Sequence, residues 1–281
     1  MRRALAGLCL LWCAAVSAQL KEEVVKVPVR VTDAFGRVIE RPITVTVFQE
    51  AGRAPYPLLV LNHGRATDAA GRYRVGRARY GDASRWLASQ GWSVWVPTRL
   101  GYGVSGIDVD PEDTGDCNRK NYPPGYAAAA EQTRQVIEFA RRRQEIEGSR
   151  TVVMGQSFGG ATSIAVASLA LPGVVGTINF AGGGGGNPDT RTANPCFPAG
   201  LERMFADYGR TARVPTLWVY TENDRWMGSR YPRQWFEAYR ANGGTGEFVQ
   251  MPPFGDDGHL LFARGLETWK PVVEKFLAAL R

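Results

Sequence analysis

Short, continuous apolar runs that alternate with amphipathic helical segments are the feature that most limits what this chain can fold into. The runs lie at residues 58–61, 92–96, 151–154, 174–180 and 216–220, with a shorter one at 248–249. A strand without a polar face must be covered on both sides, as the strands of parallel sheets are. Helical periodicity fills the intervals, at residues 80–90, 126–143, 158–170, 231–242 and 267–280. The alternation predicts an α/β fold with a mostly parallel central sheet and helices on both faces.

The segment before residue 58 has a different pattern. Residues 24–31 and 43–48 alternate apolar and polar side chains, and a turn sequence at 33–36 separates them, so we expect an N-terminal antiparallel hairpin. A length of 281 residues with 44% hydrophobic side chains suits one large domain, which we place at residues 19–281. Residues 187–208 are rich in proline and polar side chains and are expected to form an irregular, lid-like insertion.

The first 18 residues have the pattern of a secretory signal peptide. Arg2 and Arg3 precede an apolar stretch at residues 4–16, and Val16-Ser17-Ala18 supplies the small residues of a cleavage site. Cleavage before Gln19 would give an exported protein, periplasmic or secreted, with no stable membrane span; an uncleaved anchor is the alternative.

Export changes how the four cysteines are interpreted. Cys9 and Cys13 would leave with the signal peptide, which leaves Cys117 and Cys196. Two cysteines in an oxidising compartment predict one disulfide, with two buried free thiols as the alternative. Both cysteines follow predicted parallel strands, so the bridge would tie the insertion to a neighbouring loop. Two cysteines and two histidines without ligand spacing predict no metal site.

The sequence Gly155-Gln156-Ser157-Phe158-Gly159-Gly160 directly follows one apolar run and precedes a helical segment. This is the context of a nucleophile elbow, a strand-to-helix turn so tight that the residues two before and two after the nucleophile must be small. Ser157 is therefore the expected nucleophile. A glycine-rich packing turn is the alternative.

A serine nucleophile needs a base, and the chain offers two histidines. His259 lies in a loop before the last helical segment and follows Ser157, as the order serine, acid, histidine requires, so it is the predicted general base. His63 precedes Ser157; it is expected to shape the turn that presents an oxyanion donor, or to be a structural histidine. Asp224, just after the run 216–220, is the predicted acid that orients His259.

Other acidic residues are weaker candidates for that role. Glu222 is the second choice, and Asp256 and Asp257 lie on the same loop as His259. The expected oxyanion donors are backbone N–H groups, one from Phe158 and one from Arg65, with Ala66 as the alternative to Arg65.

These motifs, together with Asn62-His63-Gly64 and the segment 99–106, resemble α/β-hydrolases of the dienelactone-hydrolase-like branch, near the prolyl-oligopeptidase-type serine hydrolases. The resemblance covers about residues 58–260 and implies an α/β-hydrolase fold and hydrolysis of an ester, lactone or related acyl substrate without a cofactor. Dienelactone hydrolases carry a cysteine nucleophile and are cytosolic. Ser157 and the leader sequence depart from that pattern, so the dienelactone substrate is not carried over.

Three further patterns each have a functional and a structural interpretation. The segment 101–106 fits G-x-G-x-x-G, but an acidic, proline-containing stretch follows it instead of a helix, which argues against a dinucleotide site and favours a loop beside the active site. Tyr102 of that loop, and Trp226, are expected to line the substrate pocket. Asp108, Asp110 and Glu112 imitate a calcium loop, but Asp113 stands where glycine is needed.

The third pattern is an arginine cluster after the first parallel strand. It comprises Arg65, Arg72, Arg74, Arg77 and Arg79. One of them could pair with an anionic group of the substrate; a solvated basic surface is the alternative. No nucleic-acid recognition pattern accompanies the charge.

The sequence therefore predicts an exported serine hydrolase, most simply a carboxylesterase, acting on a small acyl substrate. A peptidase or acyltransferase with the same triad is the enzymatic alternative, and a non-catalytic binding protein on a hydrolase fold is the other.

Overall fold

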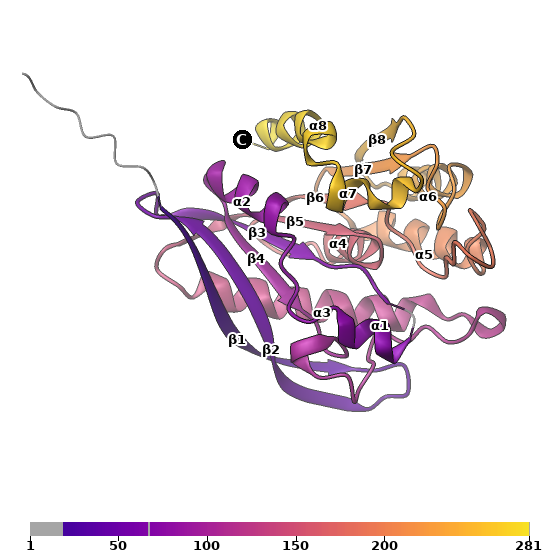
Figure 1. The fold of residues 1–281 in the computed structure, drawn as a ribbon, viewed down its shortest axis with the longest axis horizontal. Coiled ribbons are helices and arrows are strands. Elements are labelled where there is room, and N and C mark those ends of the chain that lie inside the picture. The colour runs from indigo at the N-terminus through magenta and orange to yellow at the C-terminus, as the bar shows by residue number, and fades with distance from the viewer. Residues whose placement is uncertain (1–18, 67, 281) are drawn as a thin grey trace, which may run out of the picture.

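The computed structural model describes residues 19–66 and 68–280, so the proposed signal peptide lies outside the described residues. One eight-stranded sheet runs through the molecule in the order β1-β2-β4-β3-β5-β6-β7-β8 (Figure 1). The strands are β1 Leu20–Thr32, β2 Val38–Glu50, β3 Tyr56–Asn62, β4 Ser93–Thr98, β5 Ile146–Gln156, β6 Val174–Phe180, β7 Thr216–Thr221 and β8 Gly246–Met251. β2 is antiparallel to β1 and β4, and the other pairings are parallel, so the predicted α/β class and sheet type are confirmed.

Most of the helices lie between parallel strands along the chain, and the last two follow β8. They are α1 Ala69–Arg74, α2 Gly81–Ser89, α3 Tyr122–Arg141, α4 Phe158–Ser168, α5 Pro198–Thr211, α6 Arg230–Ala241, α7 Leu261–Arg264 and α8 Leu266–Ala279. Each predicted helix is present within a few residues of its expected ends. α3 begins earlier than expected because its two prolines occupy its first turn, where a missing N–H costs no hydrogen bond.

The continuous apolar runs supply both faces of the sheet. Leu58 and Val60 of β3 belong to a core with α3, α4, α5 and α6, whereas Leu59 and Leu61 belong to a second core with α2 and α8. Figure 1 shows α2 and α8 on the side of the sheet away from α3. A strand with one polar face could not be buried between two cores. The runs therefore do not alternate apolar and polar side chains.

The N-terminal hairpin is longer than predicted. Its register places Val27 opposite Ile43, and both side chains are fully buried. The turn is held by Asp33, whose carboxylate accepts the backbone N–H groups of Phe35 and Arg37. The first residues of β1 are mostly polar and exposed, so they lack the apolar alternation that marks a strand in the sequence.

The expectation of an irregular insertion at residues 187–208 is wrong in its second half. α5 occupies Pro198–Thr211 and buries Leu201, Met204 and Phe205 in the first core. These side chains have the i, i+3, i+4 spacing of a helical face. The proline that suggested irregular structure instead begins the helix. Among the described helices, none is long and apolar enough to cross a membrane.

The parallel strands point their carboxyl ends toward the same edge of the sheet. The segments that leave β3, β5 and β7 at that edge carry His63, Ser157 and Asp224, and the segment after β8 carries His259. Loops at the carboxyl ends of strands surround the ligand in open α/β sheets. The topology therefore brings together residues that are far apart in the sequence.

Candidate active site

Ser157 occupies a strained turn between β5 and α4. Its backbone angles are φ 58° and ψ −125°, a combination that residues other than glycine rarely adopt. A Cβ at Gly155 would lie 2.1 Å from the carbonyl oxygen of Gly159, and a Cβ at Gly159 would lie 2.3 Å from the carbonyl oxygen of Asn62. The two glycines are therefore required by close backbone contact, and the turn has the geometry of a nucleophile elbow.

His259 and Asp224 are paired at the same edge. His259 Nδ1 lies 3.0 Å from Asp224 Oδ2, and both side chains are almost completely buried. The other carboxylate oxygen accepts the backbone N–H groups of Trp226, at 2.8 Å, and Met227, at 2.9 Å. Because Asp224 accepts at both oxygens, it is held as an acceptor for an Nδ1–H, which leaves Nε2 of His259 unprotonated in the neutral ring.

The weaker acid candidates do not compete for His259. Glu222 and Asp256 are exposed. Asp257 accepts the backbone N–H groups of Arg225 and His259, and the indole N–H of Trp226. Asp257 therefore ties the loop after β7 to the loop after β8, a fixing role that sequence position alone did not predict.

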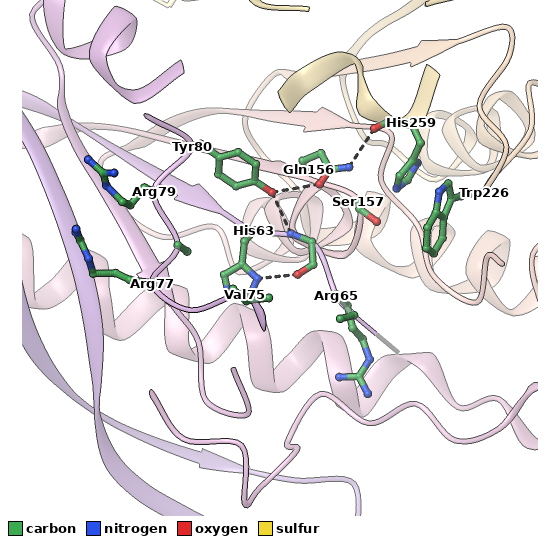
Figure 2. A pocket seen from close by; sticks show the side chains of 13 residues that line it. His63, Arg65, Val75, Arg77, Arg79, Tyr80, Gln156, Ser157, Trp226 and His259 are labelled. Carbon is green, nitrogen blue, oxygen red and sulfur yellow. Dashed lines mark hydrogen bonds between the residues drawn. The ribbon is translucent and has the colours of Figure 1, made fainter. Parts of the chain in front are cut away.

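Ser157, His259 and Trp226 line one cavity of about 570 Å³ (Figure 2). The indole of Trp226 stacks on the imidazole of His259, with ring centres 5.2 Å apart. Trp226 therefore lies at the wall of this cavity, beside His259. The remaining lining residues are His63, Gly64, Arg65, Ala66, Val75, Arg77, Ala78, Arg79, Tyr80 and Gln156.

A second, much smaller cavity of about 50 Å³ also reaches Ser157. Its lining residues are Arg65, Thr114, Lys120, Phe158, Gly183, Gly184, Gly185, Gly186, Trp226 and Met227. The disulfide between Cys117 and Cys196 borders this region, with 5.3 Å between the two Cα atoms, so the predicted bridge is present. The backbone N–H of Cys196 donates to the carbonyl oxygen of Gly185, which joins the bridge to the cavity wall.

His63 has a structural role. Its Nε2 accepts the backbone N–H of Arg99 at 3.2 Å, and its Nδ1–H donates to the carbonyl oxygen of Gly64 at 2.6 Å. Burial and the positive charge of Arg99 hold the pKa of His63 well below its usual value. A neutral ring with both nitrogens engaged cannot take a proton from serine, so this geometry removes His63 as a rival base.

One hydrogen-bonded chain at the site was missed by sequence reasoning. The backbone N–H of Gly64 donates to the hydroxyl of Tyr80, which donates to Gln156 Oε1, and Gln156 Nε2 donates to the carbonyl oxygen of His259 (Figure 2). Tyr80 has a left-handed backbone with φ 44° just before α2. No local pattern marks this tyrosine, because its hydrogen-bond partners come from two other segments.

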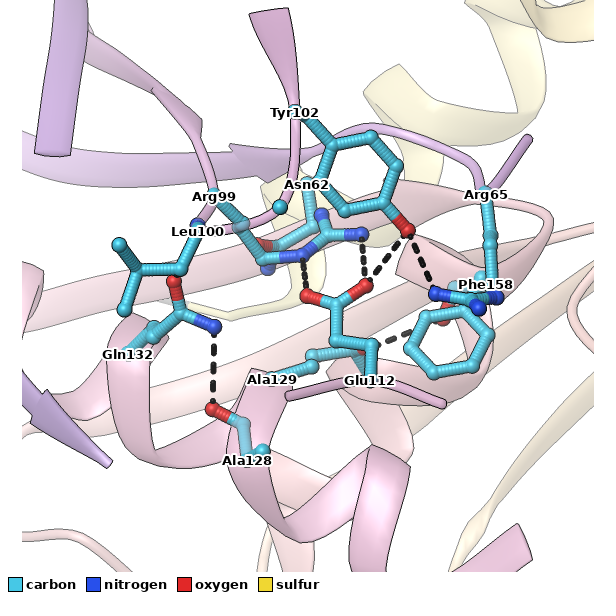
Figure 3. A network of polar contacts seen from close by, with 12 residues as sticks. Asn62, Arg65, Arg99, Leu100, Tyr102, Glu112, Ala128, Ala129, Gln132 and Phe158 are labelled. Carbon is cyan, nitrogen blue, oxygen red and sulfur yellow. Dashed lines mark hydrogen bonds and ion pairs between the residues drawn. The ribbon is translucent and has the colours of Figure 1, made fainter. Parts of the chain in front are cut away.

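Behind the cavity wall lies a buried ion pair between Arg99 and Glu112, whose side chains are completely inaccessible to solvent. Arg99 Nη1 donates to the carbonyl oxygen of His63 at 2.9 Å, and the hydroxyl of Tyr102 donates to Glu112 Oε2 at 2.8 Å (Figure 3). Tyr102 is therefore buried in this network and does not line the cavity, so its predicted pocket role is wrong. Its polar end is needed to satisfy Glu112.

The side chain of Arg65 joins the same network (Figure 3). It makes two hydrogen bonds to Asp110, each of 2.7 Å, and a third of 3.3 Å to the hydroxyl of Tyr102. Although burial opposes its charge, these contacts with Asp110 raise the pKa of Arg65. The guanidinium is thus held by Asp110, and Arg65 also lines the cavity at which its backbone N–H is the predicted oxyanion donor.

The acidic segment that imitates a calcium loop pairs instead with arginines. Asp108 pairs with Arg41, Asp110 with Arg65, and Glu112 with Arg99. Within the described part of the chain, no group of three or more His, Cys, Asp or Glu side chains could hold a metal ion.

Comparison with solved structures supports the fold. A candidate dienelactone hydrolase from Klebsiella pneumoniae aligns with a TM-score of 0.60 and 15% identity over 92% of this chain and 98% of its own. An acetyl xylan esterase from Paenibacillus sp. R4 aligns with a TM-score of 0.58 and 18% identity over 93% of this chain and 89% of its own. The acylaminoacyl peptidase of Pyrococcus horikoshii aligns with a TM-score of 0.60 and 12% identity. The alignment covers 90% of this chain but only 41% of the peptidase.

The chain thus spans about two fifths of that peptidase, and it spans most of the other two proteins. A comparison with curated protein sequences gave no significant match. Residues 54–235, well over half of the chain, match the family described as serine aminopeptidase, S33. With an eight-stranded mixed sheet and a glycine-flanked serine turn after β5, the chain belongs to this serine hydrolase family of the α/β-hydrolase superfamily.

Proposed function

We propose that the protein is a serine hydrolase that cleaves a carboxylic ester through Ser157, His259 and Asp224. Ser157 Oγ attacks the acyl carbon while His259 Nε2 takes its proton; His259 then gives that proton to the departing alcohol. A water molecule, activated by the same histidine, releases the acid from the acyl-enzyme and restores Ser157. Asp224 holds the Nδ1–H tautomer and stabilises the imidazolium.

The proposed oxyanion donors are the backbone N–H groups of Phe158 and Arg65. Phe158 is the first residue of α4, where N–H groups have no helical acceptor and the helix dipole favours negative charge. One such donor contributes about 3–4 kcal/mol to transition-state stabilisation.

The observation that carries this proposal is the buried 3.0 Å pair between His259 and Asp224 on a cavity shared with the strained Ser157. The decisive test is labelling by a fluorophosphonate probe, which forms a covalent adduct with an activated serine. Wild type should be labelled and Ser157→Ala should not. A folded wild-type protein that remains unlabelled would favour the alternative of a non-catalytic binding protein.

A peptidase activity is the second candidate, because the matching family is described as serine aminopeptidase. Turnover of aminoacyl 4-nitroanilides faster than that of 4-nitrophenyl esters, corrected for their intrinsic reactivity, would favour the peptidase. The reverse result supports the esterase.

We further propose that the substrate has an anionic group in its alcohol part. Arg77 and Arg79 line the large cavity, at the end away from Ser157 in Figure 2, and share the single carboxylate of Glu22. One positive charge of the pair is therefore not balanced by Glu22. 4-Acetoxybenzoate should have a higher kcat/KM than 4-acetoxybenzamide, and Arg77→Met should remove most of the difference. Equal values for the two substrates in wild type would rule out this preference.

Export is proposed from the leader pattern at residues 1–18. The disulfide between Cys117 and Cys196 is consistent with an oxidising compartment.

A further inference from the structure

Two cavities of very different size meet at Ser157. The large one has a volume of about 570 Å³ and the small one about 50 Å³, and both are lined by Ser157, Arg65 and Trp226. An ester bound for attack has two parts that leave the reacting carbon in different directions, the acyl group and the alcohol. The question is which part each cavity holds.

The position of His259 decides which cavity holds the alcohol and which holds the acyl group. This inference rests on the proposed mechanism. His259 must protonate the departing oxygen, so the alcohol must lie on the side that His259 lines. Of these two cavities, as lined by the described residues, His259 lines the large one, whereas Phe158 lines the small one. The alcohol therefore belongs in the large cavity, and the acyl group belongs in the small one, beside the proposed oxyanion donor.

One wall of the small cavity is backbone, which side-chain rotation cannot move. Its wall is the tract Gly183–Gly186, which packs against buried aromatic residues: a Cβ at Gly184 would lie 2.8 Å from the hydroxyl of Tyr126, and one at Gly185 would lie 2.3 Å from the hydroxyl of Tyr122. Tyr122 in turn donates to the carbonyl oxygen of Cys196, a disulfide residue. The wall is thus fixed from behind.

The volume sets the size of the acyl group. Measured in the same way, the small cavity has less than a tenth of the volume of the large one, so the acyl group must be much smaller than the alcohol. Both charged groups at this cavity already have partners: Lys120 Nζ donates to Thr114 Oγ1 and to the carbonyl oxygen of Gly115, and Arg65 is paired with Asp110. We infer that the enzyme removes short, uncharged acyl groups, acetyl or propionyl, from bulky alcohols of ring size.

The chemical step is a simple acyl transfer. The bond between the acyl carbon and the alcohol oxygen breaks, the bond to Ser157 Oγ forms, and the alcohol leaves with the proton that His259 took from Ser157. Water then attacks the short acyl-enzyme and releases acetate or propionate. No further reactant is needed.

The first experiment measures kcat/KM for 4-nitrophenyl esters from acetate to decanoate, together with phenyl, 2-naphthyl and biphenyl-4-yl acetates. One methylene group too many for a hydrophobic pocket costs about 10- to 200-fold, so hexanoate should be turned over at least about 100-fold less efficiently than acetate. The three aryl acetates, whose leaving groups have similar basicity, should differ by less than about 5-fold, because the large cavity accommodates each ring system.

Two variants separate the cavities. Met227→Ala enlarges the small one and keeps the backbone N–H that Asp224 accepts, so hexanoate should gain at least 10-fold relative to acetate. Met251→Ala, a matched loss of the same side chain at a residue of β8 outside both cavity linings, should leave the acyl-length profile unchanged. Val75→Trp, in the large cavity, should lower turnover of biphenyl-4-yl acetate and leave the acyl-length profile as in wild type.

A flat acyl-length profile, or one that peaks at octanoate, would overturn the inference if the fluorophosphonate probe still labels Ser157 in the same sample. An exchange of effects, in which Val75→Trp changes acyl preference and Met227→Ala changes alcohol preference, would show that the two cavities were assigned in reverse. Absence of labelling would overturn the serine mechanism, and this inference with it.

Discussion

Individual residues at this site have roles that depend on their hydrogen-bond partners more than on their chemical type. His259 and His63 are both buried, but His259 is paired with a carboxylate and faces a cavity, whereas His63 uses both ring nitrogens on backbone groups. Asp224 and Glu222 are two residues apart and differ in the same way, since one is buried against His259 and the other is exposed.

Asp224→Asn tests the proposed triad at this scale. The amide would favour the wrong tautomer of His259, so kcat on 4-nitrophenyl acetate should fall about 10⁴-fold with KM changed only a few-fold. Glu222→Gln, a matched change at the exposed neighbour, should keep full activity. Loss of activity in Glu222→Gln with retention in Asp224→Asn would reverse the assignment.

His63 predicts a pH dependence of stability. Its pKa is lowered in the folded protein, mainly by burial, so below about pH 6.5 the unfolded chain binds a proton that the folded protein does not. The free energy of unfolding should therefore decrease as pH falls from 6.5, by up to about 1.4 kcal/mol per pH unit. Urea unfolding between pH 7 and 5 should show this slope, and His63→Gln should reduce it. A slope equal in both proteins would contradict the prediction.

At the scale of elements, the edge of the sheet is held by contacts between loops that follow different strands. The ion pair of Arg99 and Glu112 supports the carbonyl oxygen of His63, and the disulfide joins the segment before α3 to the segment before α5. Neither contact touches the reacting atoms, so both are expected to act by positioning.

Glu112→Gln should destabilise the protein by about 3–5 kcal/mol, because it leaves the buried charge of Arg99 without a partner. The double variant Arg99→Met, Glu112→Leu should recover much of that loss, since well-packed apolar residues often replace a buried pair at little cost. It should still have a reduced kcat, because the carbonyl oxygen of His63 and the hydroxyl of Tyr102 each lose a hydrogen-bond partner. Chemical unfolding and kinetics on 4-nitrophenyl acetate separate the two effects; a double variant with full kcat would limit the pair to a structural role.

Reduction of the disulfide should affect the substrate pocket more than the core. Closing a loop between positions 79 residues apart stabilises by at most about 4.5 kcal/mol in the loop-entropy model. Dithiothreitol should therefore lower the melting temperature and raise KM, and the variant with serine at both Cys117 and Cys196 should reproduce these values without reductant. If reductant changes neither melting nor kinetics, the bridge has no such role.

For the whole molecule, the described residues form one sheet with an apolar core on each side, and the site lies where four segments leave that sheet. The leader at residues 1–18 adds a separate expectation. Mass spectrometry of the protein recovered from its producing cells should find a mature chain that begins at Gln19. A chain that retains residues 1–18 would favour the uncleaved anchor.

Much of the molecule was predictable from sequence because its elements obey local rules. Continuous apolar runs identified the parallel strands, alternation identified the hairpin, and the glycines around Ser157 identified the elbow. α5 and the first turn of α3 depart from the sequence prediction because each has proline near its start, and proline, a helix breaker elsewhere, is accepted in the first turn.

The sequence by itself determined the sheet, the elbow and a choice between two histidines, because periodicity, glycine requirements and chain order are local or one-dimensional properties. Only the tertiary structure decided that Tyr102 is buried against Glu112, that Tyr80 and Gln156 link β3 to His259, and that a glycine wall narrows one side of the site. Each of these depends on contacts between segments brought together by the sheet, and no single stretch of sequence specifies its partner.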